Sequence, residues 1–392
     1  TDEGVTTIAD GATVRLLVNG SSVGTDITTS GAYSISASVN AGDVVLVYID
    51  EHTTDGTTVT VSNGGGLSGL DIYGSRLIAR QDNGGALSNA NLATALPSPA
   101  DGDIQYSINT GNLTISGSGT ELYVWSGDSF TPGGDVTTPN MESLGIFDGG
   151  SGAIDINGAL SISGGSFTAT SGTMNISSNF TISAGTFTHN GGTIVIDGTS
   201  TINIGSETLS HLTLNAGSSN VTATNTVDLD GNLTITSANA LFGGTYEVAG
   251  HVTTTDSNFA GVSGTIVFDG GGPQILSAGG SSGIIPSVSI NKTGGTLIIS
   301  DTIGIQGSSA SFTWVAGTVV TTGSTIEFRN SNQTIDASGM SFDDVVFNTD
   351  GNVSVTGTMF IDGNVTVTNV NEFSSGTLSI AGNLTTTDST LA

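Results

Sequence analysis

The side chains that most often perform catalysis are few in this chain and widely separated. Four histidines occur in 392 residues, and none has a carboxylate at a spacing that would form a metal site or an acid–base pair. The motifs that mark a nucleophilic serine, a zinc-binding helix or a phosphate-binding loop are also missing from the sequence. We therefore predict that the chain is not an enzyme and that its histidines face solvent: His52, His189, His211 and His251.

Carboxylates offer a second kind of chemistry, the binding of cations. Acids lie close together at Asp228-Leu-Asp230-Gly-Asn and at the adjacent pair Asp343 and Asp344. Calcium takes roughly six to eight oxygen ligands, and neither place has the spacing of an EF-hand loop. The sequence favours solvated turn acids at both places. It leaves calcium as the one cofactor to test, because a surface of this charge needs counterions to assemble.

Charge excludes a nucleic-acid partner. The chain has 34 acidic residues against five basic ones, a net charge of −29, so it would be repelled by phosphates. No apolar run approaches the ~20 residues of a membrane-spanning helix, so we expect no membrane span. The chain has no cysteine and is rich in Thr, Ser, Asn and Gly, which together with the acidity is typical of secreted prokaryotic proteins. We expect an extracellular or cell-surface location, and a start at Thr1 without a signal peptide suggests a processed product or a segment of a longer one.

The predicted elements are almost all β-strands. Apolar residues alternate with Thr, Ser and Asn over short runs, and Gly or Asn-Gly separates the runs. Residues 86–96 alone predict a short helix. Runs typical of strands in the first part of the chain lie at 13–18, 33–39, 43–49 and 57–61.

The N-terminal part of the chain resembles a known kind of module. Gly31-Ala-Tyr-Ser-Ile followed by Ala41-Gly-Asp-Val is similar to the small transthyretin-like or Ig-like β-sandwiches of secreted bacterial proteins. The resemblance implies an N-terminal β-sandwich over residues 1–63. Residues 64–150 would then be a β-rich connecting region or a cap on the solenoid described below.

Residues 64–150 also hold the aromatic side chains that could bind a sugar. An exposed aromatic platform is what a carbohydrate-binding surface would need, since such rings combine a broad apolar face with a polar edge. On this basis the alternative function is a cell-surface adhesin with polysaccharide as its partner. Its candidate residues are Tyr73, Tyr106, Tyr123 and Trp125.

From residue 151 onward the sequence repeats. Residues 160–179 align with 180–199 at an offset of 20, and five apolar positions and two glycines are kept. Units of this length made of short strands predict a parallel β-solenoid (β-helix) of about ten coils over 151–392. A longer unit divides most of this region into modules 192–263, 264–323 and 324–392. The predicted inward ladder includes Ile162, Phe167, Ile176, Ile182, Phe187, Ile194 and Ile196.

The repeat resembles those of very large secreted surface proteins of environmental bacteria. The resemblance is carried by Ser166-Phe-Thr-Ala-Thr-Ser-Gly and Gly185-Thr-Phe-Thr-His-Asn-Gly-Gly-Thr-Ile-Val-Ile-Asp-Gly, and it covers residues 150–392. It implies a β-helical fold, surface placement and a structural or adhesive role. Asn348-Thr-Asp350-Gly is similar to the first acid motif of polygalacturonases, but the later motifs of that family do not follow it, and we interpret it as a turn.

The predicted solenoid has no recognisable cap after its last coil. Residues 382–392 contain no proline and no basic residue, which are devices that blunt exposed strand edges. By the module register the sequence stops where another module would stack. We therefore expect a structural subunit of an extracellular filament or surface layer, a homopolymer joined head to tail through its N-terminal region and this open end. The predicted assembly residues are Leu384, Thr386, Asp388, Leu391 and Ala392.

Overall fold

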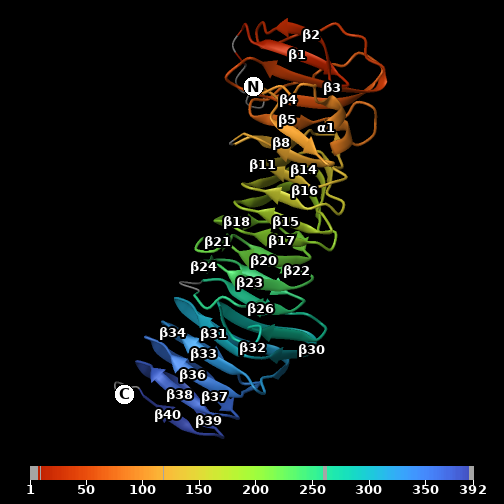
Figure 1. Cartoon of the computed structure of the whole chain (residues 1–392). Coiled ribbons are helices and arrows are strands. Elements are labelled where there is room, and N and C mark those ends of the chain that lie inside the picture. The colour runs from red at the N-terminus through yellow and green to blue at the C-terminus, as the bar shows by residue number, and fades with distance from the viewer. Residues whose placement is uncertain (1–7, 9, 118, 259–262, 388–392) are drawn as a thin grey trace. The chain divides into compact units, whose positions relative to one another are not determined.

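The computed structural model describes residues 8, 10–117, 119–258 and 263–387 (Figure 1). Strands make up 56% of the chain and helix 2%, and the strands stack in parallel into about 16 turns of a β-solenoid. This confirms the predicted all-β class and the parallel β-solenoid. The chain divides into two compact units, 1–192 and 193–392, and each is described by itself.

Unit 1 begins with an antiparallel sheet in the order β2-β1-β3-β4. β4 then pairs with β5 in parallel, Thr57 opposite Leu77, and from there the strands stack in parallel as coils. Parallel stacking therefore starts upstream of residue 151. The strands of this stack are β1 (Thr13–Val18), β2 (Ser21–Ile27), β3 (Ala41–Asp50), β4 (Thr57–Asn63), β5 (Arg76–Ala79), β8 (Glu121–Val124), β11 (Asn140–Ser143), β14 (Leu160–Thr168) and β16 (Phe180–Thr188).

Two further stacks complete the coils of unit 1. In the first of them β10 lies between β7 and β13, and β13 pairs with β15. In the other, β12 pairs with β9 and with the second half of β14. β6 forms an antiparallel hairpin with β7. These strands are β6 (Tyr106–Asn109), β7 (Asn112–Ile115), β9 (Ser129–Phe130), β10 (Val136–Thr138), β12 (Ile146–Asp148), β13 (Ile154–Ile156) and β15 (Thr173–Ile176).

The first part of unit 1 has two layers. One face of the antiparallel sheet carries a buried apolar cluster that includes Leu16, Val45 and Val47. Residues 33–39 and 64–71 cover that face, and side chains such as Tyr33 and Leu70 pack against it. Two layers fit the predicted sandwich, but among the described residues the covering layer contains no strand. The expected strand at 33–39 is thus not paired.

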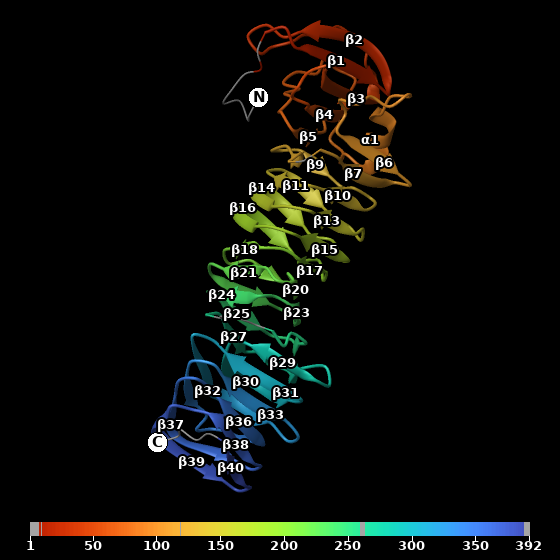
Figure 2. The same cartoon turned by 60° about the vertical axis from the view of Figure 1, so that its left-hand side comes forward.

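The helix predicted at 86–96 is present as α1 (Asn89–Ala95). Ser88 caps it, accepting the backbone N–H of Asn91, as hydroxyl side chains do at this position. Leu92 is buried, and its carbonyl accepts the hydroxyl of Tyr106 at 3.0 Å. The helix therefore lies against β6, as Figure 2 shows.

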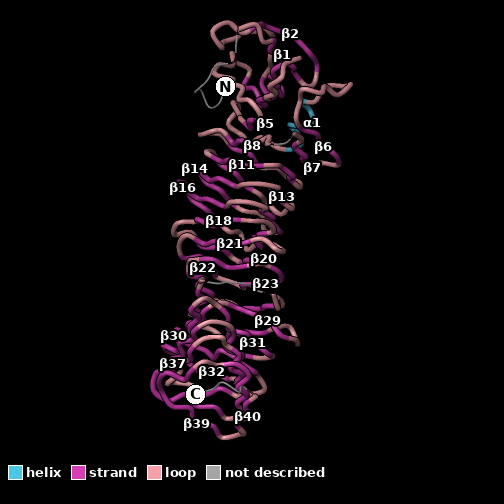
Figure 3. Tube along the Cα trace, turned by 90° about the vertical axis from the view of Figure 1, so that its left-hand side faces the viewer, coloured by secondary structure: helices cyan, strands magenta, loops and turns pink. Residues whose placement is uncertain are grey.

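Unit 2 consists of the same kind of coil throughout, and its strands follow one another as stacked rungs (Figure 3). The coils differ in length. Thr193 pairs with His211 in the next coil, whereas Val252 pairs with Leu276, which lies further along the chain. One group of strands is β17 (Thr193–Ile196), β18 (Ser200–Asn203), β19 (Thr208–Leu209), β20 (His211–Asn215), β21 (Asn220–Ala223), β22 (Thr226–Leu229), β23 (Leu233–Ser237), β24 (Ala240–Phe242), β25 (Thr245–Val248), β26 (Val252–Thr254), β27 (Thr265–Phe268) and β28 (Gln274–Ser277).

The remaining strands of unit 2 form the coils toward its C-terminal end. They are β29 (Ser282–Ile285), β30 (Ser287–Ile299), β31 (Thr302–Gln306), β32 (Ser309–Val320), β33 (Thr325–Arg329), β34 (Asn332–Asp336), β35 (Ser341–Phe342), β36 (Asp344–Asn348), β37 (Asn352–Ile361), β38 (Val365–Asn369), β39 (Glu372–Ile380) and β40 (Leu384–Thr386). β29, β31, β33, β36, β38 and β40 pair in that order as one parallel sheet.

The core of each unit is a column of apolar side chains inside the coils. Successive side chains of a strand point to opposite faces, so every second residue points inward. The predicted offset of 20 is confirmed between β14 and β16, where Leu160 pairs with Phe180 and Phe167 with Phe187. All seven residues of the predicted ladder are buried.

Candidate functional site

The histidines are bound to backbone groups at the corners of the fold. Nδ1 of His52 and of His189 accepts an N–H two residues further along. His211 accepts the N–H of Asn232, and His251 accepts that of Ile275, in each case on the next coil. None of the four is fully buried. In the described structure each of them holds a corner of the chain through a backbone N–H.

The predicted calcium residues hold neighbouring coils together through hydrogen bonds. Asp228 accepts the hydroxyl of Thr208 at 3.0 Å, and Asp344 accepts the N–H of Asn364 at 2.6 Å. Asp343 accepts the N–H of Gly323 at 2.5 Å, and Asp230 is exposed. Within the described residues, neither pair belongs to a group of three acid or histidine side chains that could meet at one ion.

Asp228 does take part in a cluster of like charges. It pairs across the sheet with Glu247. Burial first, and then the charges of Asp269 and Asp228, raise the pKa of Glu247. The same causes, burial and then Asp228, raise the pKa of Asp269. Like charges on successive coils disfavour ionisation.

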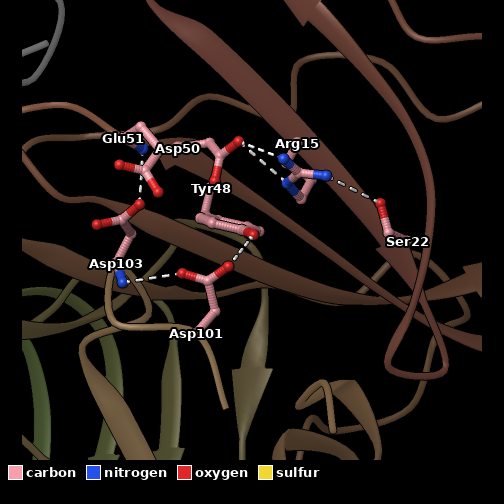
Figure 4. A network of polar contacts seen from close by, with 7 residues as sticks. All are labelled: Arg15, Ser22, Tyr48, Asp50, Glu51, Asp101 and Asp103. Atoms are coloured by element: carbon pink, nitrogen blue, oxygen red, sulfur yellow. Dashed lines mark hydrogen bonds and ion pairs between the residues drawn. The ribbon is translucent and has the colours of Figure 1, made fainter. Parts of the chain in front are cut away.

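The acids that do converge are Asp50, Asp101 and Asp103 (Figure 4). One ligand oxygen of each lies within 4.8 Å of the others, and Asp50 is buried at the end of β3. The sequence analysis missed this group because Asp50 and Asp101 are far apart in the chain, which leaves no local spacing to recognise.

Partners within the protein already engage these three carboxylates. Arg15 reaches Asp50 at 2.6 Å, which raises the pKa of Arg15 through that hydrogen bond. The hydroxyl of Tyr48 donates to Asp101 at 2.7 Å, and the pKa of Tyr48 is raised by burial first and by this bond second. The three acids could give a divalent cation one oxygen each, and calcium would need roughly three to five more.

Three of the four aromatic residues proposed for sugar binding meet in one cluster on unit 1. Ring centroids are 5.8 Å apart for Tyr73 and Tyr123, and 5.5 Å apart for Tyr73 and Trp125. The guanidinium carbon of Arg76 lies 4.9 Å from the centroid of Tyr123. Tyr106 lies elsewhere, against α1. Only Trp125 is more than 9% exposed, so these rings form a packed cluster and not an open platform.

Lys292, the single lysine of the sequence, is buried at a corner of unit 2. Its Nζ donates to the carbonyls of Gly270 at 2.7 Å and Gly272 at 2.9 Å and to Oε1 of Gln274 at 2.6 Å. The amide of Gln274 in turn donates to Val248 and Gly250 of the preceding coil. Burial lowers the pKa of Lys292. This pair joins three coils through their corner carbonyls.

The last described coil presents an uncovered inner face. β39 pairs with β37, and β40 pairs with β38; on the other side of β40 the described residues provide no strand. Leu384 stacks on Val365, which is fully buried, yet Leu384 itself is 61% exposed. The last described coil, with β39 and β40, covers the inward residues of the coil before it. No described residue covers the inward residues of the last coil itself.

The uncovered face is hollowed and mainly apolar. A depression of about 310 Å³ is lined by Phe373, Leu378, Leu384 and Thr386 of the last coil and by Val355 and Val367 below it. Two of the five predicted assembly residues, Leu384 and Thr386, therefore line one surface. The other three, Asp388, Leu391 and Ala392, lie outside the described residues.

Comparison with known proteins gives no further assignment. No protein-family model, no curated protein and no solved structure matches the chain. In the described part of the chain, no helix is long and apolar enough to cross a membrane.

Proposed function

We propose that this protein is a structural subunit of an extracellular filament or surface layer and that it polymerises head to tail. The observation that supports this most directly is the uncovered inner face of the last described coil. A parallel coil exposes unpaired backbone groups and apolar ladder residues until another strand pairs with it. Leu384, at 61% exposure, is the clearest example.

A second unpaired edge lies in unit 1. β2 pairs with β1 on one side only among the described residues, and its Val23 and Ile27 are 43% and 59% exposed. The described residues thus show two different edges without a paired strand, and we propose that each pairs with another copy. A contact between two different surfaces repeats from copy to copy and gives a fibre unless the rotation closes a ring.

Such a contact is feasible although the protein has a net charge of −29, because the contact surface itself carries little charge. The described residues that line the terminal depression are all uncharged. Two copies can therefore meet there with little like-charge repulsion, which is what otherwise keeps strongly acidic chains apart. Carbohydrate binding lacks comparable support, since Tyr73, Tyr106 and Tyr123 are at most 9% exposed.

The test compares two substitutions in one strand by sedimentation velocity. Leu384 points inward over Val365, whereas Thr385 is exposed and pairs with Thr366 on the outer surface. Leu384→Arg should shift the protein from polymers to monomers, because a charge would enter the apolar contact. Thr385→Arg adds the same charge and should polymerise like the natural chain.

Two results would overturn the proposal. One is a natural chain that stays monomeric across salt and calcium concentrations. The other is a Leu384→Arg variant that polymerises as readily as Thr385→Arg.

A further inference from the structure

The segment 33–39 of unit 1 packs on the antiparallel sheet without pairing as a strand. Tyr33, Ile35 and Val39 are half-buried and the residues between them are exposed. The alternation of a strand packed on one face therefore holds over 33–36 and is interrupted at the exposed Ala37. Yet the described residues provide no backbone hydrogen-bond partner for residues 35–39. Exposed backbone groups can be satisfied by water, so this segment keeps free backbone donors and acceptors that another strand could take up.

A groove runs between this segment and residues 64–71. Its volume is about 880 Å³, and its floor is the apolar face of the antiparallel sheet at Leu16, Val45 and Val47. The hydroxyl of Tyr33 donates to the carbonyl of Leu70 and ties the two walls together. Three consecutive glycines at 64–66 line the groove and have no side chains to fill it.

This groove has the dimensions and chemistry of a place for one more strand. Five residues of extended chain span about 17 Å, and residues 35–39 offer that length of unpaired backbone. The aliphatic floor would receive alternate side chains of an inserted strand. A small apolar ligand would leave the backbone groups of 35–39 unpaired, so the unpaired edge favours a peptide strand.

We propose that the groove between residues 33–39 and 64–71 binds an extended strand from a second copy of this chain, which completes the second layer of the N-terminal sandwich. Strand addition of this kind gains affinity from main-chain hydrogen bonds and selectivity from side-chain pockets. The inference rests on the proposed head-to-tail assembly and adds a second acceptor surface in the N-terminal region, distinct from the edge of β2.

A second copy fits this groove better than an unrelated partner does. Among the described residues that line the groove, Asp71 is the single acid and none is basic, so a bound strand should be nearly uncharged. Strands of this chain meet that need, because only 10% of its residues are charged against about 25% in ordinary proteins. They also supply the alternation of aliphatic residues with Thr and Ser that the floor and the open side require.

The test uses proline to remove backbone donors from the unpaired segment. N–H groups alternate between the two edges of a strand, so Ala37→Pro and Ser38→Pro together sample both edges. Proline suits the extended conformation and should leave the monomer folded. At least one of the two variants should lose polymer formation by more than about tenfold, while Ala37→Ser, which keeps its N–H, should polymerise like the natural chain.

Amide hydrogen exchange on the natural chain gives an independent readout. Residues 35–39 should exchange about tenfold or more slowly in polymers than in dissociated monomers, while the amides of β14 stay protected in both. If polymers form but 35–39 remain unprotected and both proline variants polymerise, this inference is wrong and the head-to-tail proposal stands. If the natural chain never polymerises, both are wrong.

Discussion

At the scale of single residues, polar side chains inside this fold serve the backbone of neighbouring coils. Lys292 donates to the carbonyls of Gly270 and Gly272, and His211 accepts the N–H of Asn232 on the next coil. Coil corners leave backbone groups outside the strand ladders, and buried groups of this kind require partners. The sequence did not predict these roles, because coil length varies along the chain and shifts which corner meets which side chain.

Asp128 gives a testable consequence of burial at one residue. Burial raises its pKa from 3.8 to about 6, so the folded protein keeps this proton to a higher pH than the unfolded chain does. Stability from this group is therefore greatest below about pH 4 and falls as the pH rises toward 6. We expect Asp128→Asn to raise the free energy of unfolding by about 2–3 kcal/mol at neutral pH and to have little effect near pH 3.5.

Denaturant unfolding at the two pH values measures this difference. Asparagine keeps an oxygen that can accept the backbone N–H of Gln81, which bonds to the carboxylate in the natural protein. An equal effect of the substitution at both pH values would contradict the assignment of the raised pKa to Asp128.

At the scale of elements, the apolar alternation and the offset of 20 predicted the register of β14 and β16 residue by residue. The same reasoning did not find where parallel stacking begins. Leu77 of β5 pairs with Leu122 of β8, but the inserted helix and hairpin between them hide the repeat. The strand expected at 33–39 is not formed among the described residues, since pairing depends on a second segment that local sequence does not reveal.

The stacked phenylalanines of unit 1 should contribute strongly to its stability, which a substitution can test. The ring centroid of Phe167 lies 4.7 Å from that of Phe147 and 5.9 Å from that of Phe187, and Phe167 is fully buried. Phe167→Ala should lower the free energy of unfolding by about 3–5 kcal/mol, because it removes these contacts and leaves a cavity. Thr168→Ala, on the outer face of the same strand, should cost less than about 1 kcal/mol.

Thermal or denaturant unfolding of both variants checks this prediction. Comparable losses for Phe167→Ala and Thr168→Ala would mean that the column of inward rings is not what holds the coils of unit 1 together.

At the scale of the whole molecule, the sequence predicted a contact between copies, which stays a prediction. The structure places two of its five predicted residues, Leu384 and Thr386, on the uncovered face of the last described coil. The proposed sugar-binding rings are packed instead, because Arg76, Ile78 and Leu144 surround them, and such long-range packing has no signature in local sequence. The acidic group of Asp50, Asp101 and Asp103 escaped notice for the same reason.

The central claim is that copies of this chain join head to tail, with the coil stacks of successive copies running along the fibre. Electron microscopy of the purified protein, with the diffraction of aligned fibres, tests it most directly. Neighbouring parallel strands are about 4.8 Å apart, so head-to-tail fibres should show a meridional reflection near that spacing and one subunit per axial repeat. Dispersed single particles, or fibres whose reflection near ~4.8 Å lies off the meridian, would contradict the claim.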